Sequence, residues 1–208
     1  MARLSIFPLA GALLFPRALL PLHIFEPRYR AMISDAMARD RRIGMIQPRD
    51  DTVERPALFE IGCIGRIAEV EALDDGRFNI ILEGLTRFRL VSELDVTTPF
   101  RQVEADIAAF VGDDAEPAPL GIALRADLER EARRYADAKG YAIDWAAVER
   151  LDDEGLVNGV AQVTPFDVAT KQALLEAPDI AERADLVVQF LRFFRLDDSD
   201  DDDGATLQ

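Results

Sequence analysis

The chain contains a single histidine, His23, and a carboxylate, Glu26, follows it three positions later. A histidine beside a carboxylate can act as a general base, and with a nearby serine it would indicate a hydrolase. None of the four serines, however, stands in the Gly-x-Ser-x-Gly setting that exposes a nucleophile. A structural histidine, packed or partly exposed, is therefore favoured. Hydrolysis by His23 or by carboxylates is kept as an alternative function.

The other reactive side chains do not form a recognisable site. Cys63 lies between Gly62 and Ile64, which favours a small core residue, and a single cysteine cannot form an internal disulfide or a cysteine–histidine zinc site. Lys139 and Lys171 lie outside any Gly-x-x-x-x-Gly-Lys-Ser/Thr phosphate-binding loop. The sequence therefore predicts no metal, no cofactor and no nucleotide site.

Glu69 and Glu71 are the most regular pair of carboxylates. In a strand, Ile67, Glu69 and Glu71 would project from one side, with successive members about 7 Å apart. That separation falls within the range for inverting glycosidases. Alternating charge is also typical of a solvent-exposed strand face, and the sequence offers nothing else that a glycosidase needs. We interpret both residues as surface residues and expect a protein that is not an enzyme.

The chain carries 39 acidic and 24 basic residues, a formal net charge of −15. This charge repels phosphate backbones and anionic membranes, so neither nucleic acid nor membrane is an expected partner, and RNA binding remains only a further alternative. Residues 197–208, with six aspartates, are predicted to be an acidic disordered tail. The single cysteine and the lack of an apolar run of about 18 residues or a clear signal peptide favour a cytoplasmic location.

Residues 1–111 have the pattern of a β-rich subdomain. Residues 20–25 alternate, as a strand with two different faces requires. The clearest hairpin spans 66–83, where Asp75-Gly76 is a strong turn signal. Gly84 predicts a bulge or bend in the returning strand. Several short antiparallel strands divided by glycine and proline predict a small, strongly bent barrel or pair of sheets.

One helix interrupts these strands. Pro27 suits its first turn, and Glu26 is expected to pair with Arg30. Five residues at spacings of three and four fall on its predicted buried face: Tyr29, Met32, Ile33, Ala36 and Met37.

After a linker at 111–119, residues 119–196 are predicted to form a helical bundle. Thr164 is expected to cap one helix, with a proline in the first turn, and Asp144 and Asp179 are expected to cap two others. The predicted fold class is α+β, in which an N-terminal bent antiparallel β-subdomain with one helix precedes a C-terminal α-helical bundle.

The N-terminal apolar segment, 10–22, is too interrupted by glycine and proline to form one helix. It suits either a core strand that plugs the barrel or an apolar groove for peptides, because accessible apolar patches usually mark binding sites. The residues predicted to bind a peptide in that groove are Leu13, Leu14, Phe15, Pro16 and Leu19.

Four segments together resemble the N-terminal domain of the Lon ATP-dependent protease family, and most closely the stand-alone bacterial proteins made of that domain alone. They are FPL (7–9), LLFPRALLPLHIFEPRYRAMISDAM (13–37), IGCIGRIAEVEALDDGRFNIILEGLTRFRL (61–90) and LVNGVAQVTPFDVATKQALLEAPDIAERADLVVQFL (156–191). They occur in the family's order, and the resemblance covers the chain up to about residue 195.

The resemblance implies a PUA-like pseudo-barrel followed by a helical bundle, and a module that recognises unfolded or exposed polypeptide segments or acts as an adaptor. The implied partners are unfolded or partly folded polypeptides and an ATP-dependent protease. It implies structural roles for Phe7-Pro8-Leu9, Phe15-Pro16, Phe25-Glu26, Arg28-Tyr29, Glu83-Gly84, Arg87 and Lys171-Gln172. The ATPase and Ser–Lys proteolytic modules of that protease have no counterpart in these 208 residues, so proteolysis is not expected of them.

Overall fold

The computed structural model describes residues 1–50, 52–53 and 55–202, which divide into two compact units. Unit 1 consists of Met1–Glu116 and Pro165–Leu175, and unit 2 consists of Pro117–Thr164 and the chain from Glu176 onward. The first crossing between the units coincides with the predicted linker. The chain then crosses between the units twice more, which the sequence did not predict. The segment Pro165–Leu175, inside the expected helical bundle, belongs to the β-rich unit.

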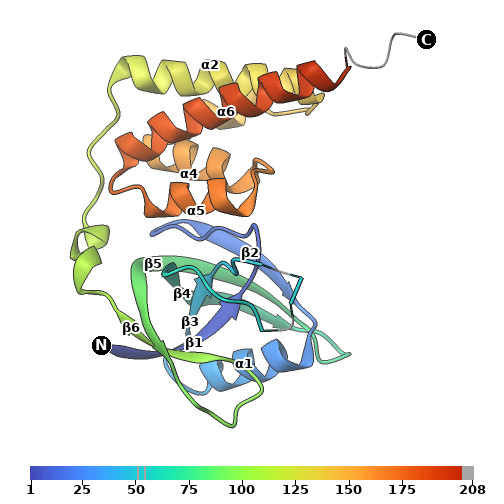
Figure 1. Cartoon of the computed structure of the whole chain (residues 1–208), viewed down its shortest axis with the longest axis vertical. Coiled ribbons are helices and arrows are strands. Elements are labelled where there is room, and N and C mark those ends of the chain that lie inside the picture. The colour runs from blue at the N-terminus through green and yellow to red at the C-terminus, as the bar shows by residue number, and fades with distance from the viewer. Residues whose placement is uncertain (51, 54, 203–208) are drawn as a thin grey trace. The chain divides into compact units, whose positions relative to one another are not determined.

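Unit 1 contains a six-stranded sheet. Its strands are β1 (Ala2–Pro8), β2 (Leu19–Ile24), β3 (Arg42–Ile46), β4 (Ile61–Ala72), β5 (Phe78–Glu93) and β6 (Gln102–Asp106). Their order is β2-β5-β4-β3-β1-β6, and an additional pairing of β5 with β6 closes the sheet on itself and leaves β2 outside the closed part (Figure 1).

The α+β class is confirmed, but the sheet is mixed rather than wholly antiparallel. β1 and β3 run parallel, with Ile6 opposite Gly44. Parallel neighbours require a long crossover between them, and here β2 and the helix α1 (Pro27–Met37) lie between the two strands in the chain. Alternation within a strand carries no information about the direction of its partner, so the sequence did not predict this pair.

β5 takes part in three pairings because it is long and bent. Its first part pairs with β2, its last part pairs with β6, and β4 pairs with it over most of its length. The register of β4 and β5 shifts beside Gly84. A Cβ atom on Gly84 would lie 1.9 Å from the backbone oxygen of Phe15, so only glycine fits there without rearrangement. The bend predicted at Gly84 is present.

A second register shift reverses the face of the sheet to which side chains at the end of β4 point. Ile67 pairs with Leu82 and is buried, whereas Glu69 pairs with Ile81 and is exposed. The intervening Ala68 is the extra residue of a bulge, and one extra residue moves every following side chain to the opposite face. The prediction that Ile67 projects from the same side as Glu69 was therefore wrong.

Helix α1 forms as expected. Pro27 begins it, and Tyr29, Met32, Ile33 and Ala36 are buried. Glu26, however, pairs with Arg28 at 2.8 Å rather than with Arg30. Glu26 precedes the helix in extended backbone, with φ −65° and ψ 133°, so the i,i+4 geometry of a helical pair does not apply to it.

A buried ion pair fastens the segment that follows β6. The guanidinium of Arg87 on β5 lies 2.7 Å from Asp113, the second-to-last residue of the 3-10 helix η1 (Ala108–Asp114). The backbone N–H of Arg87 also donates to this carboxylate at 2.8 Å, and its Nη1 donates to the backbone oxygen of Leu175 at 3.3 Å. A buried charge needs such partners, so Arg87 holds three segments of unit 1 together.

Helix α5 (Val168–Glu176) packs in unit 1 through buried polar side chains. The amide nitrogen of Gln47 donates to Gln172 at 3.1 Å, and the ammonium of Lys171 donates to the backbone oxygen of Gly11 at 2.7 Å. Burial lowers the pKa of Lys171. These polar contacts, which a hydrophobic pattern does not reveal, explain why α5 groups with the sheet.

The start of α5 also differs from the prediction. Asp167 supplies the side-chain cap, since its carboxylate accepts a hydrogen bond from the backbone N–H of Thr170 at 2.6 Å. Thr164 instead ends the preceding helix in extended backbone, with ψ 131°. The physical cause is Pro165, because a residue before proline is disfavoured in the helical conformation.

Unit 2 consists of helices. They are α2 (Ile122–Lys139), α3 (Trp145–Val148), α4 (Asp153–Val163) and α6 (Ile180–Asp202). The predicted caps are confirmed: Asp144 accepts from the backbone N–H of Ala147 at 3.1 Å, and Asp179 accepts from that of Glu182 at 2.9 Å. Helices α2 and α6 lie side by side (Figure 1).

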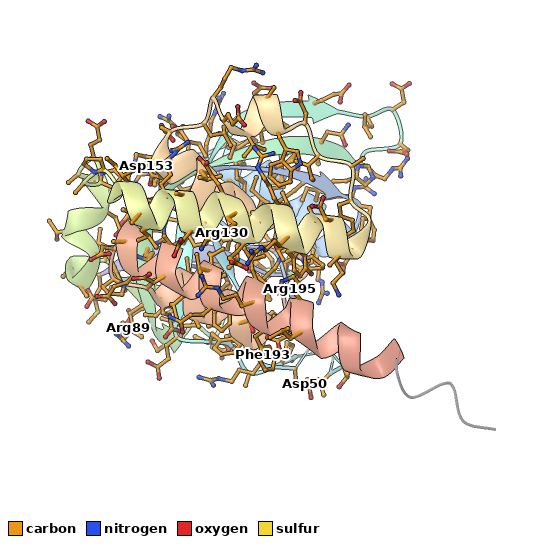
Figure 2. All side chains as sticks on the ribbon, turned by 90° about the horizontal axis from the view of Figure 1, so that it is seen from above. Asp50, Arg89, Arg130, Asp153, Phe193 and Arg195 are labelled. Carbon is orange, nitrogen blue, oxygen red and sulfur yellow. The ribbon has the colours of Figure 1, made fainter. Side chains whose placement is uncertain are left out.

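A buried carboxylate joins α2 and α6. Glu131 is 2% exposed and has guanidinium nitrogens at 3.1 to 3.8 Å from four arginines: Arg130, Arg134, Arg192 and Arg195. Figure 2 labels Arg130 on α2 and Arg195 on α6, one from each helix. Because a buried charge without partners is strongly destabilising, this cluster fixes the two helices against each other.

α6 continues to Asp202, past the predicted boundary at residue 196. The segment 197–208, which was predicted to be a disordered acidic tail, therefore begins within a helix, and 203–208 lie outside the described residues. An existing helix extends at the cost of ordering one residue per added hydrogen bond, which favours continuation over several acidic residues.

Candidate functional site

Most of the predicted peptide-binding segment belongs to the core of unit 1. Four of the five residues are buried: Leu13, Leu14, Phe15 and Pro16. Leu19 is 57% exposed. The five residues therefore do not form one accessible groove in this structure, and the core interpretation of this segment fits its burial.

Backbone contacts hold this segment in the core. The N–H of Arg17 donates to the backbone oxygen of Gly84 at 2.8 Å, and the N–H of Gly84 donates to that of Ala18 at 2.9 Å. The N–H of Gly11 donates to the side chain of Gln47 at 3.1 Å. A segment with its polar backbone paired in this way can bury its apolar side chains at little cost.

His23 lies on the exposed face of β2, in a chain of hydrogen bonds. The amide of Asn79 donates to Glu71 at 2.7 Å, so its oxygen is available to accept from Nδ1 of His23, also at 2.7 Å. Nε2 of His23 then accepts from Arg77 at 3.2 Å. This assignment makes His23 a neutral donor to Asn79. Glu26, which pairs with Arg28, is not its partner.

These hydrogen bonds lie beside a shallow hollow on the outer face of the sheet, which we call the outer groove. Its volume is about 540 Å³. Its lining residues come from β2, β4 and β5: Pro21, Leu22, His23, Glu69, Val70, Glu71, Asn79, Ile80 and Ile81. The groove belongs wholly to unit 1.

Two rows of side chains across the strands form the walls of the outer groove. In the first row, Pro21 and Glu69 both pair with Ile81, and in the second, His23 and Glu71 both pair with Asn79. The first row is mostly apolar and the second is polar. Residues opposite one another on neighbouring strands have Cβ atoms about 5 Å apart, so each row forms a continuous contact surface.

The electrostatics of the outer groove are negative. Glu83 next to it pairs with Arg66, and Asp75 in the hairpin turn pairs with Arg77. Hydrogen bonds from Arg77 lower the pKa of Asp75, so this carboxylate stays charged at neutral pH. Among the ion pairs of the described residues, none includes Glu69 or Glu71. The two carboxylates of the walls thus keep their charge available.

The groove lies beside a sheet edge, because β2 has a neighbour on one side only in the strand order. An edge strand has unpaired backbone groups that another chain can bind. Pro21 has no N–H and interrupts this edge, a usual protection against uncontrolled strand pairing. The side-chain face beside Pro21, rather than a long backbone ladder, is the accessible feature.

Sequence reasoning identified His23, Glu69 and Glu71 as candidates but did not bring them together. Asn79 and Ile81, which connect them, were missed. Their positions depend on the register of three strands and on the bulge at Ala68, and no local pattern gives that register.

The remaining reactive residues lie outside the groove. Cys63 is buried in β4, and Lys171 is buried in α5. Within the described residues, no group of three or more His, Cys, Asp or Glu side chains is placed to hold a metal ion. None of the helices described here has the length and apolar run that crossing a bilayer requires.

The sequence of the chain matches the family model of the ATP-dependent protease La (LON) substrate-binding domain over residues 3–192. The chain belongs to the Lon substrate-binding domain family. This match includes both units and confirms the resemblance seen in the sequence. This family is the substrate-binding domain of Lon rather than its catalytic part.

The chain is similar to one part of several much longer Lon proteases. Lon protease 2 of Myxococcus xanthus is 28% identical over 194 residues, which are 90% of this chain and 23% of that protein. Lon protease 2 of Sorangium cellulosum is 29% identical over 192 residues, 88% of this chain and 24% of that protein. The chain thus spans about a quarter of the length of the curated relatives that it matches.

Solved structures of Lon N-terminal domains have the same fold. The Lon N-terminal domain protein from Xanthomonas campestris covers 91% of this chain, with a TM-score of 0.63 and 21% identity. The N-terminal domain of the Mycobacterium avium complex Lon protease covers 92% of the chain, with a TM-score of 0.64 and 16% identity. At these identities, the similarity establishes the α+β fold.

Proposed function

We propose that this Lon-type domain is a non-catalytic module that binds unfolded or exposed polypeptide segments and presents them to an ATP-dependent protease in the cytoplasm. The observation that carries the proposal is the match to a substrate-binding domain over residues 3–192. The relatives that share this domain are proteases, whose substrates are polypeptides. The adaptor role adds a second partner, the protease itself.

The outer groove is the surface that we propose for the polypeptide. It is concave, and its walls combine apolar contact at Pro21 and Ile81 with polar groups from His23 and Asn79. Exposed Leu19 lies on the same strand as Pro21 and two positions before it, so it extends the apolar wall. Leu19 is thereby the one residue of the predicted peptide-binding set that keeps this role in the proposal.

The test is a titration of labelled, unstructured peptides with the full chain, followed by fluorescence anisotropy. Saturable binding is expected, and Ile81→Ser should weaken it about tenfold, the loss expected for about 1.4 kcal/mol of apolar contact. Ile122→Ser is the matched control, because Ile122 is 91% exposed and lies in unit 2.

Two results would count against the proposal. Absence of saturable binding up to about 1 mM peptide, where the binding free energy is only about −4 kcal/mol, would refute polypeptide binding. Equal affinity of the Ile81→Ser variant and the Ile122→Ser control would show that the peptide binds elsewhere. Circular dichroism of each variant establishes that it is folded.

The adaptor role has its own measurement. Co-sedimentation of the chain with a Lon-type protease from the same cells, with and without an unfolded polypeptide, should show a complex that contains both. If the chain never sediments with the protease, the adaptor role is lost, while peptide binding is judged by the titration alone.

A further inference from the structure

The walls of the outer groove hold two carboxylates at the spacing of alternate residues in an extended chain. Glu69 and Glu71 are both exposed on β4, beyond the bulge at Ala68. Because they are two residues apart in a strand, their side chains leave the same face about 7 Å apart. An extended peptide beside β4 presents its own alternate side chains at the same interval.

The surroundings leave these carboxylates without a cationic partner among the described residues. Glu71 accepts one hydrogen bond from the neutral amide of Asn79, and the ion pairs around the groove involve Glu83 and Asp75 instead. The whole chain has a net charge of −15. Cationic segments are therefore attracted to this face over a distance of about 8 Å at physiological salt, and acidic segments are repelled.

An apolar contact lies directly beside Glu69. Ile81 pairs with Glu69 on one side and with Pro21 on the other, so a side chain that reaches Glu69 crosses an apolar surface. Lysine and arginine suit this arrangement, because their alkyl stems cover apolar surface while the charged end reaches a carboxylate. Asp or Glu side chains would meet Glu69 with like charge.

We propose that the outer groove selects extended segments that carry lysine or arginine at alternate positions, which pair with Glu69 and Glu71. The selection rests on the proposed function, since it names which polypeptides the groove binds. It follows from the spacing of the two carboxylates, the apolar side chain of Ile81 between Glu69 and β2, and the lack of ion pairs to either carboxylate within the described part of the chain.

The experiment measures the affinity of the full chain for three unstructured peptides of equal length. The first has two lysines at alternate positions, the second has the same two lysines side by side, and the third has glutamine at both positions. Side-by-side residues of an extended peptide point to opposite faces, so only one lysine can reach the groove. The alternate peptide should bind about fivefold more tightly than the glutamine peptide, as two exposed ion pairs allow, and the side-by-side peptide should fall between them.

A double variant and its matched control separate the groove from the overall charge. Glu69→Gln with Glu71→Gln should remove the preference among the three peptides. Glu182→Gln with Asp185→Asn removes the same two charges from exposed positions on α6 in unit 2, and it should keep the preference. Both variants are surface changes, and thermal unfolding checks that both remain folded.

Three outcomes would overturn the proposal. They are equal binding of all three peptides, the same preference in the Glu69/Glu71 variant as in the native chain, and a preference lost equally in the α6 control. In each case peptide binding itself stands. If none of the peptides binds, the proposed function fails first, so the two failures can be told apart.

Discussion

Two neighbouring segments of unit 1, residues 13–16 and 19–25, have similar apolar content but differ in burial. The first is buried throughout, whereas the second alternates, with Leu19, Pro21 and His23 exposed and Ile24 buried. A continuous apolar run has no face to give to solvent, so it enters the core. An alternating run places one face on the barrel and leaves the other exposed to solvent. The difference between the core segment and the exposed segment thus lies in periodicity rather than in the amount of hydrophobicity.

The largest effect is expected when a large side chain of the buried segment is shortened. Phe15 is fully buried, so Phe15→Ala should lower the free energy of unfolding by about 3–5 kcal/mol, as for other large core truncations. Urea denaturation of the native chain and the variant measures it. A cost below about 1 kcal/mol would mean that residues 13–16 are not core and would revive them as a ligand surface.

Gly84 on β5 tests the burial of residues 13–16 from the neighbouring strand. A Cβ atom would lie 1.9 Å from the backbone oxygen of Phe15, so Gly84→Ala forces the buried segment away from β5. We expect a loss of about 1–3 kcal/mol in unfolding free energy, the usual range for overpacking. Gly112→Ala is the control, because nothing lies within 4 Å of the added atom and its φ is not positive. Equal effects of the two substitutions would contradict the close contact.

The sequence predicted local features more successfully than distant ones. Helix α1, the bend at Gly84 and the caps Asp144 and Asp179 depend on residues within a few positions of one another, and all are present. The parallel pairing of β1 with β3 and the inclusion of α5 in unit 1 depend on partners far away in the chain, and these were not predicted.

The outer groove was predicted only in part, because it depends on both local and distant features. Alternation correctly placed Glu69 and Glu71 on an exposed face and left His23 as packed or partly exposed, but a groove needs three strands in one register. The bulge at Ala68 reverses the face of Ile67 relative to Glu69, and one inserted residue leaves no mark in the hydrophobic pattern. Candidate residues were thus found singly, and the surface that they share was not.

Lys171 gives a pH test of how the buried segment is anchored. Burial lowers the pKa of Lys171 in the folded chain, while the unfolded chain keeps the ordinary value of 10.5. Between these two values the unfolded state binds more protons, so the unfolding free energy should rise with pH in that window. Below the lowered pKa, both states are protonated and this contribution is constant.

The measurement is urea denaturation at several pH values up to about 10.5, compared with the Lys171→Met variant, in which the other titrating groups are unchanged. The native chain should gain stability relative to the variant as the pH rises. A constant difference between the two would show that burial does not lower the pKa of Lys171 in the folded chain.

The smallest effect on stability is expected at Leu19, and it completes the comparison. Leu19 is 57% exposed, so Leu19→Ser should change the unfolding free energy by less than about 0.5 kcal/mol. The same substitution should weaken peptide binding, because it removes apolar contact at the end of the wall formed by Pro21 and Ile81. Phe15→Ala should behave in the reverse way, with a large loss of stability and, while the chain remains folded, unchanged affinity. If Leu19→Ser destabilises the chain without altering binding, then the alternating segment is also structural, and periodicity alone does not separate the two surfaces.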